Sequence, residues 1–266
     1  MGNNKITALV ASYNEASLLT DCLESIQFCD TIIAVDLMSG DNTAEIARPL
    51  STRVLKHKVL PVIEALHYEL IPTLKDNWIL IIDPDERIEP SLAEQLMQFV
   101  HTKTSNSIGI VYVPFQFYFK GKALRGGTWG GIKEKRLLLH KDRLVFSPNV
   151  HLGATLKHGY KAHKIAYDTT NVVHHYWMSD YKQLISKHRR YLDREGQARY
   201  EQGLRFRYVQ LLRTPIVSFY EAFIKKRGYK DGLTGLFLAL FWAWYNYKSR
   251  LSLKQYQQNK TGVVNG

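Results

Sequence analysis

Three short polar clusters each follow an apolar, strand-like segment, and their residue types suit nucleotide and metal chemistry. They are Ser12-Tyr13-Asn14-Glu15, Asp36 with Ser39-Gly40-Asp41-Asn42-Thr43, and Asp83-Pro84-Asp85-Glu86. In open α/β sheets, ligands bind beyond the carboxyl ends of the strands, so the loops at those ends converge. The three clusters therefore predict one site.

The Asp83-Pro84-Asp85 triplet is the sharpest of these signals. Alternate residues of an extended turn point to one side, with Cα atoms about 6–7 Å apart. Two carboxylates placed in this way offer oxygen ligands to a hard divalent cation. Mg²⁺ or Mn²⁺ usually retains waters in such sites and binds substrate phosphates. A solvated acidic turn leading into the helix after Pro90 is the alternative interpretation.

The other two clusters suit a nucleotide. Tyr13 offers a ring that can stack on a base, and Asp36 ends a strand, where acidic residues accept hydrogen bonds from a base or ribose. A packed loop aromatic and a turn residue are the respective alternatives, and Ser-Gly-Asp-Asn around Asp41 is good turn chemistry by itself. The chain has no G-x-G-x-x-G after the first strand, no P-loop and no G-x-S-x-G elbow. The first two absences argue against dinucleotide oxidoreductases and P-loop ATPases.

The elements that must position the clusters alternate between strand and helix through the first hundred residues. Short apolar or β-branched segments predict strands at 5–11, 31–36, 52–56 and 78–82. Helical spacing of apolar residues predicts helices at 18–26, 43–48 and 62–74, and a capping box at Ser91 and Glu94 predicts another. Such alternation is typical of a parallel sheet with helices on both faces.

The pattern changes after about residue 105. Strand-like segments follow without helices between them, at 108–114, 116–119, 135–140 and 170–174, around a glycine-rich loop at 121–131. From Asp180 onward the pattern is helical, and we expect Pro215 and Gly228 to separate three helices. We therefore expect a catalytic domain at 1–179, with a nucleotide-binding half at about 1–105 and an acceptor half at about 106–179. A helical tail follows at 180–266.

The formal net charge of +12 belongs almost entirely to this tail. Residues 180–266 hold 17 Lys and Arg against 6 Asp and Glu, which gives +11, whereas the rest holds 19 against 18. Basic helices with the apolar and aromatic residues at 233–245 suit an anionic membrane surface. The alternatives are that these aromatics pack on the catalytic domain, or that the surface binds nucleic acid, which no recognised motif supports.

Cysteine content and hydropathy set the expected location. Cys22 and Cys29 are too few for a disulfide scaffold or a zinc site, which favours reduced thiols. The N-terminal sequence lacks a signal-peptide pattern, and the longest apolar stretch, 233–247, is shorter than the about 20 residues that a span needs. We expect a cytoplasmic protein that is peripheral at the inner face of the cytoplasmic membrane.

Three segments together resemble glycosyltransferase family 2, namely ALVASYNEASLLTDCLESI, IIAVDLMSGDNTAEIA and NWILIIDPDE. The later sequence, including HHYWMSDYKQLISKHRRYLDREGQARY, is similar to the subgroup that adds sugars to bacterial lipopolysaccharide core. The resemblance runs from about residue 5 to about residue 250. It implies a GT-A fold, with a Rossmann-like, mostly parallel central sheet. It also implies inverting transfer from a nucleotide-diphosphate sugar, most commonly a UDP-sugar, to a saccharide or lipid-linked acceptor.

The resemblance also implies roles for individual residues. The residues that match its nucleotide pocket are Ser12, Tyr13, Asn14, Glu15 and Asp36, and we add Asp41 from the second cluster. Asp83 matches a residue near the ribose, and Asp85 matches the ligand of Mn²⁺ or Mg²⁺ on the diphosphate. His174 or His175 falls where the subgroup has a histidine that completes the metal site, although a lone histidine there is otherwise a packed or surface residue.

Inverting transfer also needs a general base within hydrogen-bond reach of the acceptor hydroxyl. The subgroup usually carries Val-His-Glu in its middle region, whereas this chain has Val-His-Leu at 150–152. The predicted bases are Glu134, which follows the glycine-rich loop, and His151. Glu134 has a structural alternative, which is pairing with Lys133 or Lys135.

Two alternative functions follow from departures in the sequence. The chain lacks the glutamate of Val-His-Glu. It also lacks a basic residue next to Asn, which the subgroup usually has in the helix before the fourth strand. Both departures favour a catalytically impaired, nucleotide-binding member of the family. A sugar nucleotidyltransferase is the other alternative, although its usual glycine-rich N-terminal loop is absent from this sequence.

Overall fold

The chain forms two compact units in the computed structural model, which describes residues 4–60, 62–147 and 154–262. The first unit comprises Met1–Phe115 and Lys133–His175, and the second comprises Gln116–Ile132 and Tyr176–Gly266. The chain thus leaves the first unit, returns to it, and leaves it again for the C-terminal helices.

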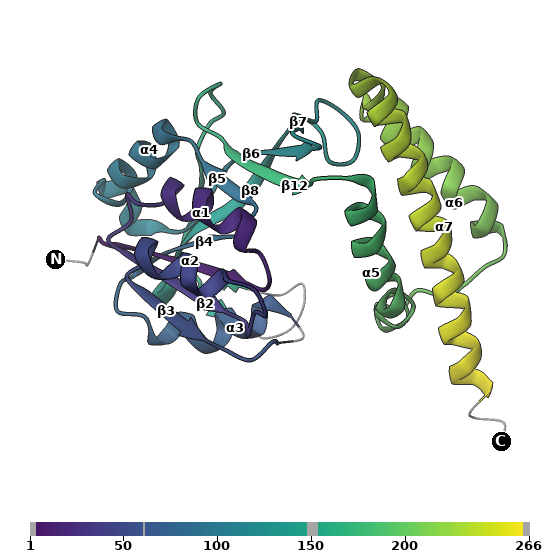
Figure 1. Ribbon diagram of the computed structural model, residues 1–266. Helices are drawn as coiled ribbons and strands as arrows, with labels where there is room; N and C mark the ends of the chain where they lie inside the picture. Colours follow the sequence, from purple (N-terminus) through teal and green to yellow (C-terminus); the bar gives the residue numbers. More distant parts are fainter. Residues whose placement is uncertain (1–3, 61, 148–153, 263–266) are drawn as a thin grey trace. The chain divides into compact units, whose positions relative to one another are not determined.

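A parallel sheet forms the core of the first unit (Figure 1). Its strands, in the spatial order β3-β2-β1-β4, are β3 (Arg53–Lys56), β2 (Thr31–Asp36), β1 (Ile6–Ser12) and β4 (Trp78–Ile82). β1, β2 and β4 are almost continuously apolar because the sheet is buried on both faces. In register, Ser12 lies beside Asp36, so the polar ends of β1 and β2 meet.

The crossover helices cover both faces of this sheet. They are α1 (Ala16–Ser25), α2 (Thr43–Leu50) and α3 (Ile63–Leu70), the last followed by a 3-10 turn at Ile71–Thr73. Right-handed crossovers place α1 and α2 on one face and α3 on the other, because the step from β3 to β4 reverses direction along the sheet. On the α3 face, Leu66 packs in a buried cluster with Leu9, Ile33 and Ile79.

The sheet continues past β4 in the order β8-β6-β12-β5. The added strands are β5 (Glu86–Ile88), β6 (Ile108–Phe119), β8 (Ile132–His140) and β12 (Val173–Met178). β8 runs antiparallel to β4, and β12 runs antiparallel to β5. The smaller elements are α4 (Pro90–Val100), β7 (Lys122–Ala123), β9 (Leu144–Phe146), β10 (Ala154–Leu156) and β11 (Lys161–Lys164). The predicted class, α/β with a mostly parallel central sheet and a helical C-terminal extension, is confirmed.

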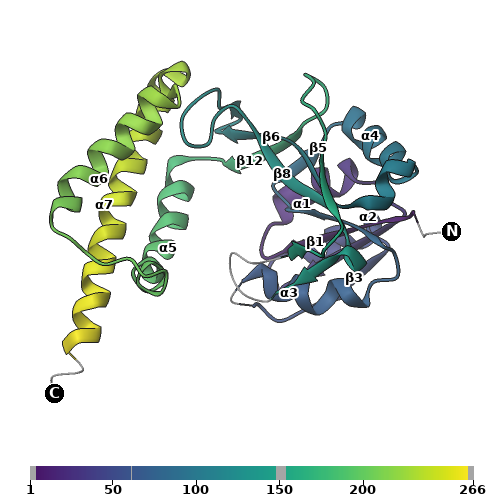
Figure 2. The same cartoon turned by 180° about the vertical axis from the view of Figure 1, so that it is seen from behind.

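The second unit is built on three helices (Figure 2). They are α5 (Tyr181–Glu201), α6 (Val209–Tyr220) and α7 (Gly232–Gly262). Asp180 caps α5 by accepting a hydrogen bond from the backbone N–H of Gln183 at 2.8 Å. A buried cluster joins Trp177 and Phe119 to Leu184 of α5 and Phe241 of α7. Among the residues that the structure describes, no helix is both long and apolar enough to cross a bilayer.

Two local predictions were wrong. Ser91 does not cap a helix, because α4 already begins at Pro90 and the Ser91 hydroxyl donates instead to the carbonyl of Thr170. Pro215 does not separate helices but lies inside α6. Proline there removes one backbone hydrogen bond, and the packing of α6 along α7 sustains the helix across that gap.

Candidate active site

The loops that follow β1 and β2 are tied to each other by hydrogen bonds. The backbone N–H of Asn14 donates to Ser39 Oγ at 3.0 Å, and that of Gly40 donates to Asn14 Oδ1 at 2.7 Å. The N–H of Glu15 donates to Thr43 Oγ1 at 3.3 Å. Asn14 holds a φ of 54°, a left-handed conformation that asparagine tolerates better than most residues. The structure thus brings the first two polar clusters together.

Asp36 and Tyr13 lie within this pair of loops. Asp36 is buried, and its Oδ1 accepts a hydrogen bond from the N–H of Ser39 at 2.9 Å, which fixes the carboxylate at the end of β2. Half of Tyr13 is exposed, so its ring is accessible to a planar ligand. Both placements are compatible with nucleotide binding.

Asp41 has a structural task in the same loops. Its carboxylate accepts hydrogen bonds from the hydroxyl and the N–H of Thr43 and from the N–H of Ala16. These bonds, chiefly the one from the Thr43 hydroxyl, lower the pKa of Asp41. Asp41 therefore joins the beginnings of α1 and α2, and its contact with a nucleotide remains a prediction.

The third cluster forms a tight turn between β4 and β5. The N–H of Glu86 donates to the carbonyl of Asp83 at 3.0 Å, with Pro84 at the second position, where its fixed φ suits a turn. The N–H of Asp83 in turn donates to Glu86 Oε2 at 3.0 Å. The side chain of Glu86 therefore closes the turn that carries Asp83 and Asp85.

Two residues anchor this turn to α1. The guanidinium of Arg87 donates to the carbonyls of Pro84 and Leu18, both at 2.8 Å, and pairs with Asp21 at 3.2 Å. The thiol of Cys22, which is fully buried, donates to the carbonyl of Asp83 at 3.3 Å. Burial raises the pKa of the Cys22 thiol, so it stays protonated and able to donate.

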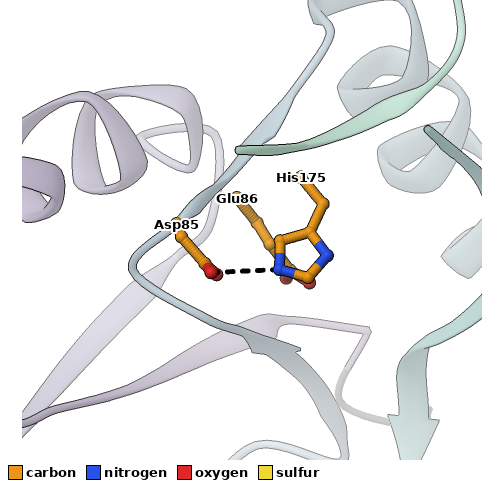
Figure 3. Close-up of side chains that lie close together, drawn as sticks. All are labelled: Asp85, Glu86 and His175. Carbon is orange, nitrogen blue, oxygen red and sulfur yellow. Dashed lines mark hydrogen bonds and ion pairs between the residues drawn. The ribbon is translucent and has the colours of Figure 1, made fainter. Parts of the chain in front are cut away.

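A candidate metal centre lies beside the turn (Figure 3). His175 Nε2 lies 3.0 Å from Asp85 Oδ2, and both side chains are 14% exposed. The ligand atoms of Asp85, Glu86 and His175 all lie within 4.8 Å of one another. His175 reaches this position because the register of β12 on β5 sets it opposite Glu86. The neighbouring His174 instead pairs with Glu89 at 2.5 Å, so the structure brings only one of the two histidines to Asp85.

Glu86 and Lys135 form a buried ion pair next to Asp85. Glu86 is 1% exposed, and Lys135 Nζ contacts its carboxylate and lies 3.7 Å from Asp83 Oδ2. Burial raises the pKa of Glu86 against the attraction of Lys135. Burial alone would lower the pKa of Lys135, but the carboxylates of Glu86 and Asp83 outweigh it and raise that pKa. The Lys135 ammonium group therefore stays charged among the carboxylates of Asp83, Asp85 and Glu86.

The sequence predicted no role for Lys135 and no separate function for Glu86. Glu86 follows the Asp-Pro-Asp triplet directly, which was the available signal. Lys135 is one of several charges in IKEKR and carries no signal of its own. Only the pairing of distant strands brings its ammonium group to the turn.

The two predicted bases are placed differently. The carboxylate of Glu134 is exposed and pairs with Lys164 at 2.7 Å, so the structure does not bring it to the Asp85–His175 pair. His151 lies outside the described residues.

The donor set of the cluster fits a divalent cation. Ligand bonds of about 2 Å let one ion touch atoms that lie about 4 Å apart. Carboxylate oxygens suit Mg²⁺ and Mn²⁺, and imidazole binds transition metals, so a mixed set favours Mn²⁺. Because Glu86 already closes the turn and pairs with Lys135, Asp85 and His175 are the better candidates for ligands.

Comparison with known proteins gives relatives along nearly the whole chain. The lipopolysaccharide core biosynthesis glycosyltransferase LpsC of Rhizobium meliloti is 24% identical, covering 94% of this chain and 92% of its own. An uncharacterised glycosyltransferase of Rickettsia bellii is 22% identical, with coverages of 94% and 86%. Among solved structures, Staphylococcus aureus TarS 1–349 aligns with a TM-score of 0.46 and 11% identity, over 96% of this chain and 92% of its own.

The family assignment follows from a match longer than half of the chain. Residues 7–160, which contain all three polar clusters, match the family described as Glycosyl transferase family 2. This match confirms the GT-A class expected from the resemblance. The chain therefore belongs to glycosyltransferase family 2.

Proposed function

We propose that this protein is an inverting glycosyltransferase that moves a sugar from a nucleotide-diphosphate donor to a saccharide or lipid-linked acceptor in cell-envelope glycan synthesis. The observation that carries the proposal is the pairing of Asp85 with His175 beside the turn that follows β4. Family membership supports the reaction class, and the relative named for lipopolysaccharide core biosynthesis supports the pathway.

The donor site combines the three loops. We assign Asp85 and His175 to Mn²⁺ or Mg²⁺, which when bound offsets the charge that develops on the leaving diphosphate. Asp83 is assigned to the ribose, Asp36 to a base N–H or ribose hydroxyl, and Tyr13 to the face of the base. UDP is the nucleotide to test first, because it is the commonest in this family.

The acceptor hydroxyl attacks the anomeric carbon as the bond to the diphosphate breaks, and its proton passes to a general base. Glu134 and His151 remain the proposed bases. For Glu134 this role requires release from Lys164, and the two side chains are more than half exposed, so such a rearrangement costs little.

The tail connects the enzyme to its acceptor in this proposal. The tail carries a net charge of +11 and the catalytic region is nearly neutral, so the tail is the part that attracts an anionic lipid surface. We place the protein peripherally at the inner face of the cytoplasmic membrane, where a lipid-linked acceptor would be presented.

Asp36→Asn is expected to weaken UDP binding by about 10–100-fold, because a hydrogen bond to a charged group contributes about 1.5–3 kcal/mol. Asparagine keeps an acceptor for the N–H of Ser39, so the loop should retain its form. Isothermal titration with UDP and Mn²⁺ measures the effect. Asp193→Asn, which changes an exposed carboxylate of α5, is the control. Equal affinity in the two variants would remove Asp36 from the nucleotide site.

The proposed reaction is tested by incubating the full chain with a panel of nucleotide-sugars and Mn²⁺ and measuring release of the nucleoside diphosphate. We expect release with at least one donor and its acceleration by a suitable acceptor. Binding of UDP without turnover of any donor would contradict the proposal and support the catalytically impaired alternative. Release of pyrophosphate when the chain is incubated with a nucleoside triphosphate and a sugar phosphate would instead indicate a sugar nucleotidyltransferase.

A further inference from the structure

Helix α6 and the π-helical turn after it, Glu221–Lys225, expose an apolar stripe on the second unit. The exposed fractions are 60% for Val209, 76% for Leu212, 69% for Ile216, 57% for Tyr220 and 46% for Ile224. Their spacing of three or four residues places them on one face of the helix. We call these five residues the α6 stripe.

The opposite face of α6 is the packed one. Ser218 is 8% exposed and Ala222, in the following turn, is 2% exposed. α6 lies alongside α7 in both ribbon views (Figures 1 and 2). The small side chains allow a close approach, and the large apolar side chains of the stripe point away from the unit's core.

Most aromatic residues of α7, in contrast, pack inside the second unit. The sequence favoured 233–245 as the membrane-facing segment, but Leu238, Phe241 and Tyr245 are each less than 10% exposed. Leu238 and Phe241 belong to the buried cluster of the second unit, and Phe237 and Trp244 pack against it. Leu233 and Leu240 of α7 stay exposed, at 85% and 54%, but most of the exposed large apolar side chains between residues 208 and 245 lie on α6 and the turn after it.

Basic residues flank the α6 stripe at both ends. Between residues 203 and 230 the chain carries Arg205, Arg207, Arg213, Lys225, Lys226, Arg227 and Lys230, with Glu221 as the one carboxylate in that sequence. Tyr208, which is 70% exposed, and Tyr229, which is 51% exposed, mark the two ends. An apolar face with basic flanks and terminal aromatics is typical of helices that lie in a membrane interface.

We propose that the α6 stripe inserts into an anionic lipid surface, with α6 lying in the plane of the interface. A helix of 12 residues is about 18 Å long, which suits lying on a bilayer rather than crossing it. Pairing with a second copy would also cover the stripe, but it would bring two sets of basic residues together, whereas anionic lipid neutralises them. The inference deepens the proposed function and rests on it for the source of the lipid-linked acceptor.

Flotation of the full chain with phosphatidylcholine vesicles, with and without phosphatidylglycerol, tests the proposal. We expect binding only with phosphatidylglycerol, and at least about a tenfold loss of partitioning in Leu212→Glu/Ile216→Glu. The matched control is Ile63→Glu/Met97→Glu, which places two carboxylates at exposed apolar positions on α3 and α4. Each neutralised residue in Arg213→Gln/Lys225→Gln should cost about fivefold.

Three results would overturn the proposal: no flotation of the wild type, equal loss in the control, or a wild-type dimer in sedimentation that Leu212→Glu/Ile216→Glu dissociates. Circular dichroism and thermal melting check that the variants fold. Release of the nucleoside diphosphate in lipid-free buffer should be the same in the stripe variant and the wild type. If neither the wild type nor the stripe variant releases the nucleoside diphosphate while flotation behaves as expected, the proposed function is wrong and the membrane-binding surface is still supported.

Discussion

Asp85→Asn is expected to lower kcat/KM for nucleotide-sugar turnover by at least about 100-fold, because it removes the charged ligand from a cation that contributes several kcal/mol of transition-state stabilisation. Asparagine has nearly the same size, and the turn is closed by hydrogen bonds between Asp83 and Glu86. The fold should therefore persist. Release of the nucleoside diphosphate at varied Mn²⁺ concentration measures the effect.

The control for Asp85→Asn is a variant that changes a carboxylate outside the site. Glu94→Gln changes an exposed side chain of α4 and should leave turnover unchanged. Chelation by EDTA should abolish activity in the wild type and in Glu94→Gln, and added Mn²⁺ should restore it. Activity of Asp85→Asn within a few-fold of the wild type at all Mn²⁺ concentrations would exclude Asp85 as the ligand.

Lys135→Met is expected to lower the free energy of unfolding by about 3–5 kcal/mol, because it leaves Glu86 buried without a cationic partner. The double variant Glu86→Gln/Lys135→Met should recover most of this loss. It contains no buried unpaired charge, and the glutamine can still accept the hydrogen bond from the N–H of Asp83. Urea unfolding at neutral pH gives the free energy of unfolding of the wild type, of Lys135→Met and of the double variant.

The chain supplies a matched exposed pair for this experiment. Lys164 and Glu134 are 63% and 55% exposed, and exposed ion pairs typically contribute less than about 1 kcal/mol. Lys164→Met should therefore change stability little. If Lys135→Met costs no more than Lys164→Met, or if the double variant is as unstable as the single one, the buried pair does not hold the turn as inferred.

The parallel half of the sheet was predictable because burial on both faces demands a continuous apolar segment. β2 and β4 follow the predicted bounds of 31–36 and 78–82. β5 was not predictable, since its three residues, Glu86–Ile88, include two charges and become a strand only by pairing with β12. The same pairing decides which of two adjacent histidines meets Asp85, and no local pattern contains that information.

The residues of the candidate site were likewise predictable only where a local sequence pattern marks them. Asp36, Asp83 and Asp85 were predicted as site residues because each lies at the end of a strand or just after it, where such sheets bind ligands. Lys135 was not found, because it reaches Glu86 across 49 residues of sequence. In the tail, sequence alone could not distinguish the packed aromatics of α7 from the exposed stripe of α6, since both segments are amphipathic or apolar at helical spacing.

The central claim is that Asp85 and His175 together hold the cation that binds the donor diphosphate. Electron spin-echo spectroscopy of Mn²⁺ bound with UDP to the full chain tests it directly. We expect a nitrogen coupling from an imidazole and a phosphorus coupling from the diphosphate. His175→Gln should remove the nitrogen coupling and keep the phosphorus coupling, whereas His174→Gln should keep both. A wild-type spectrum without nitrogen coupling, or one that His175→Gln leaves unchanged, would contradict the account.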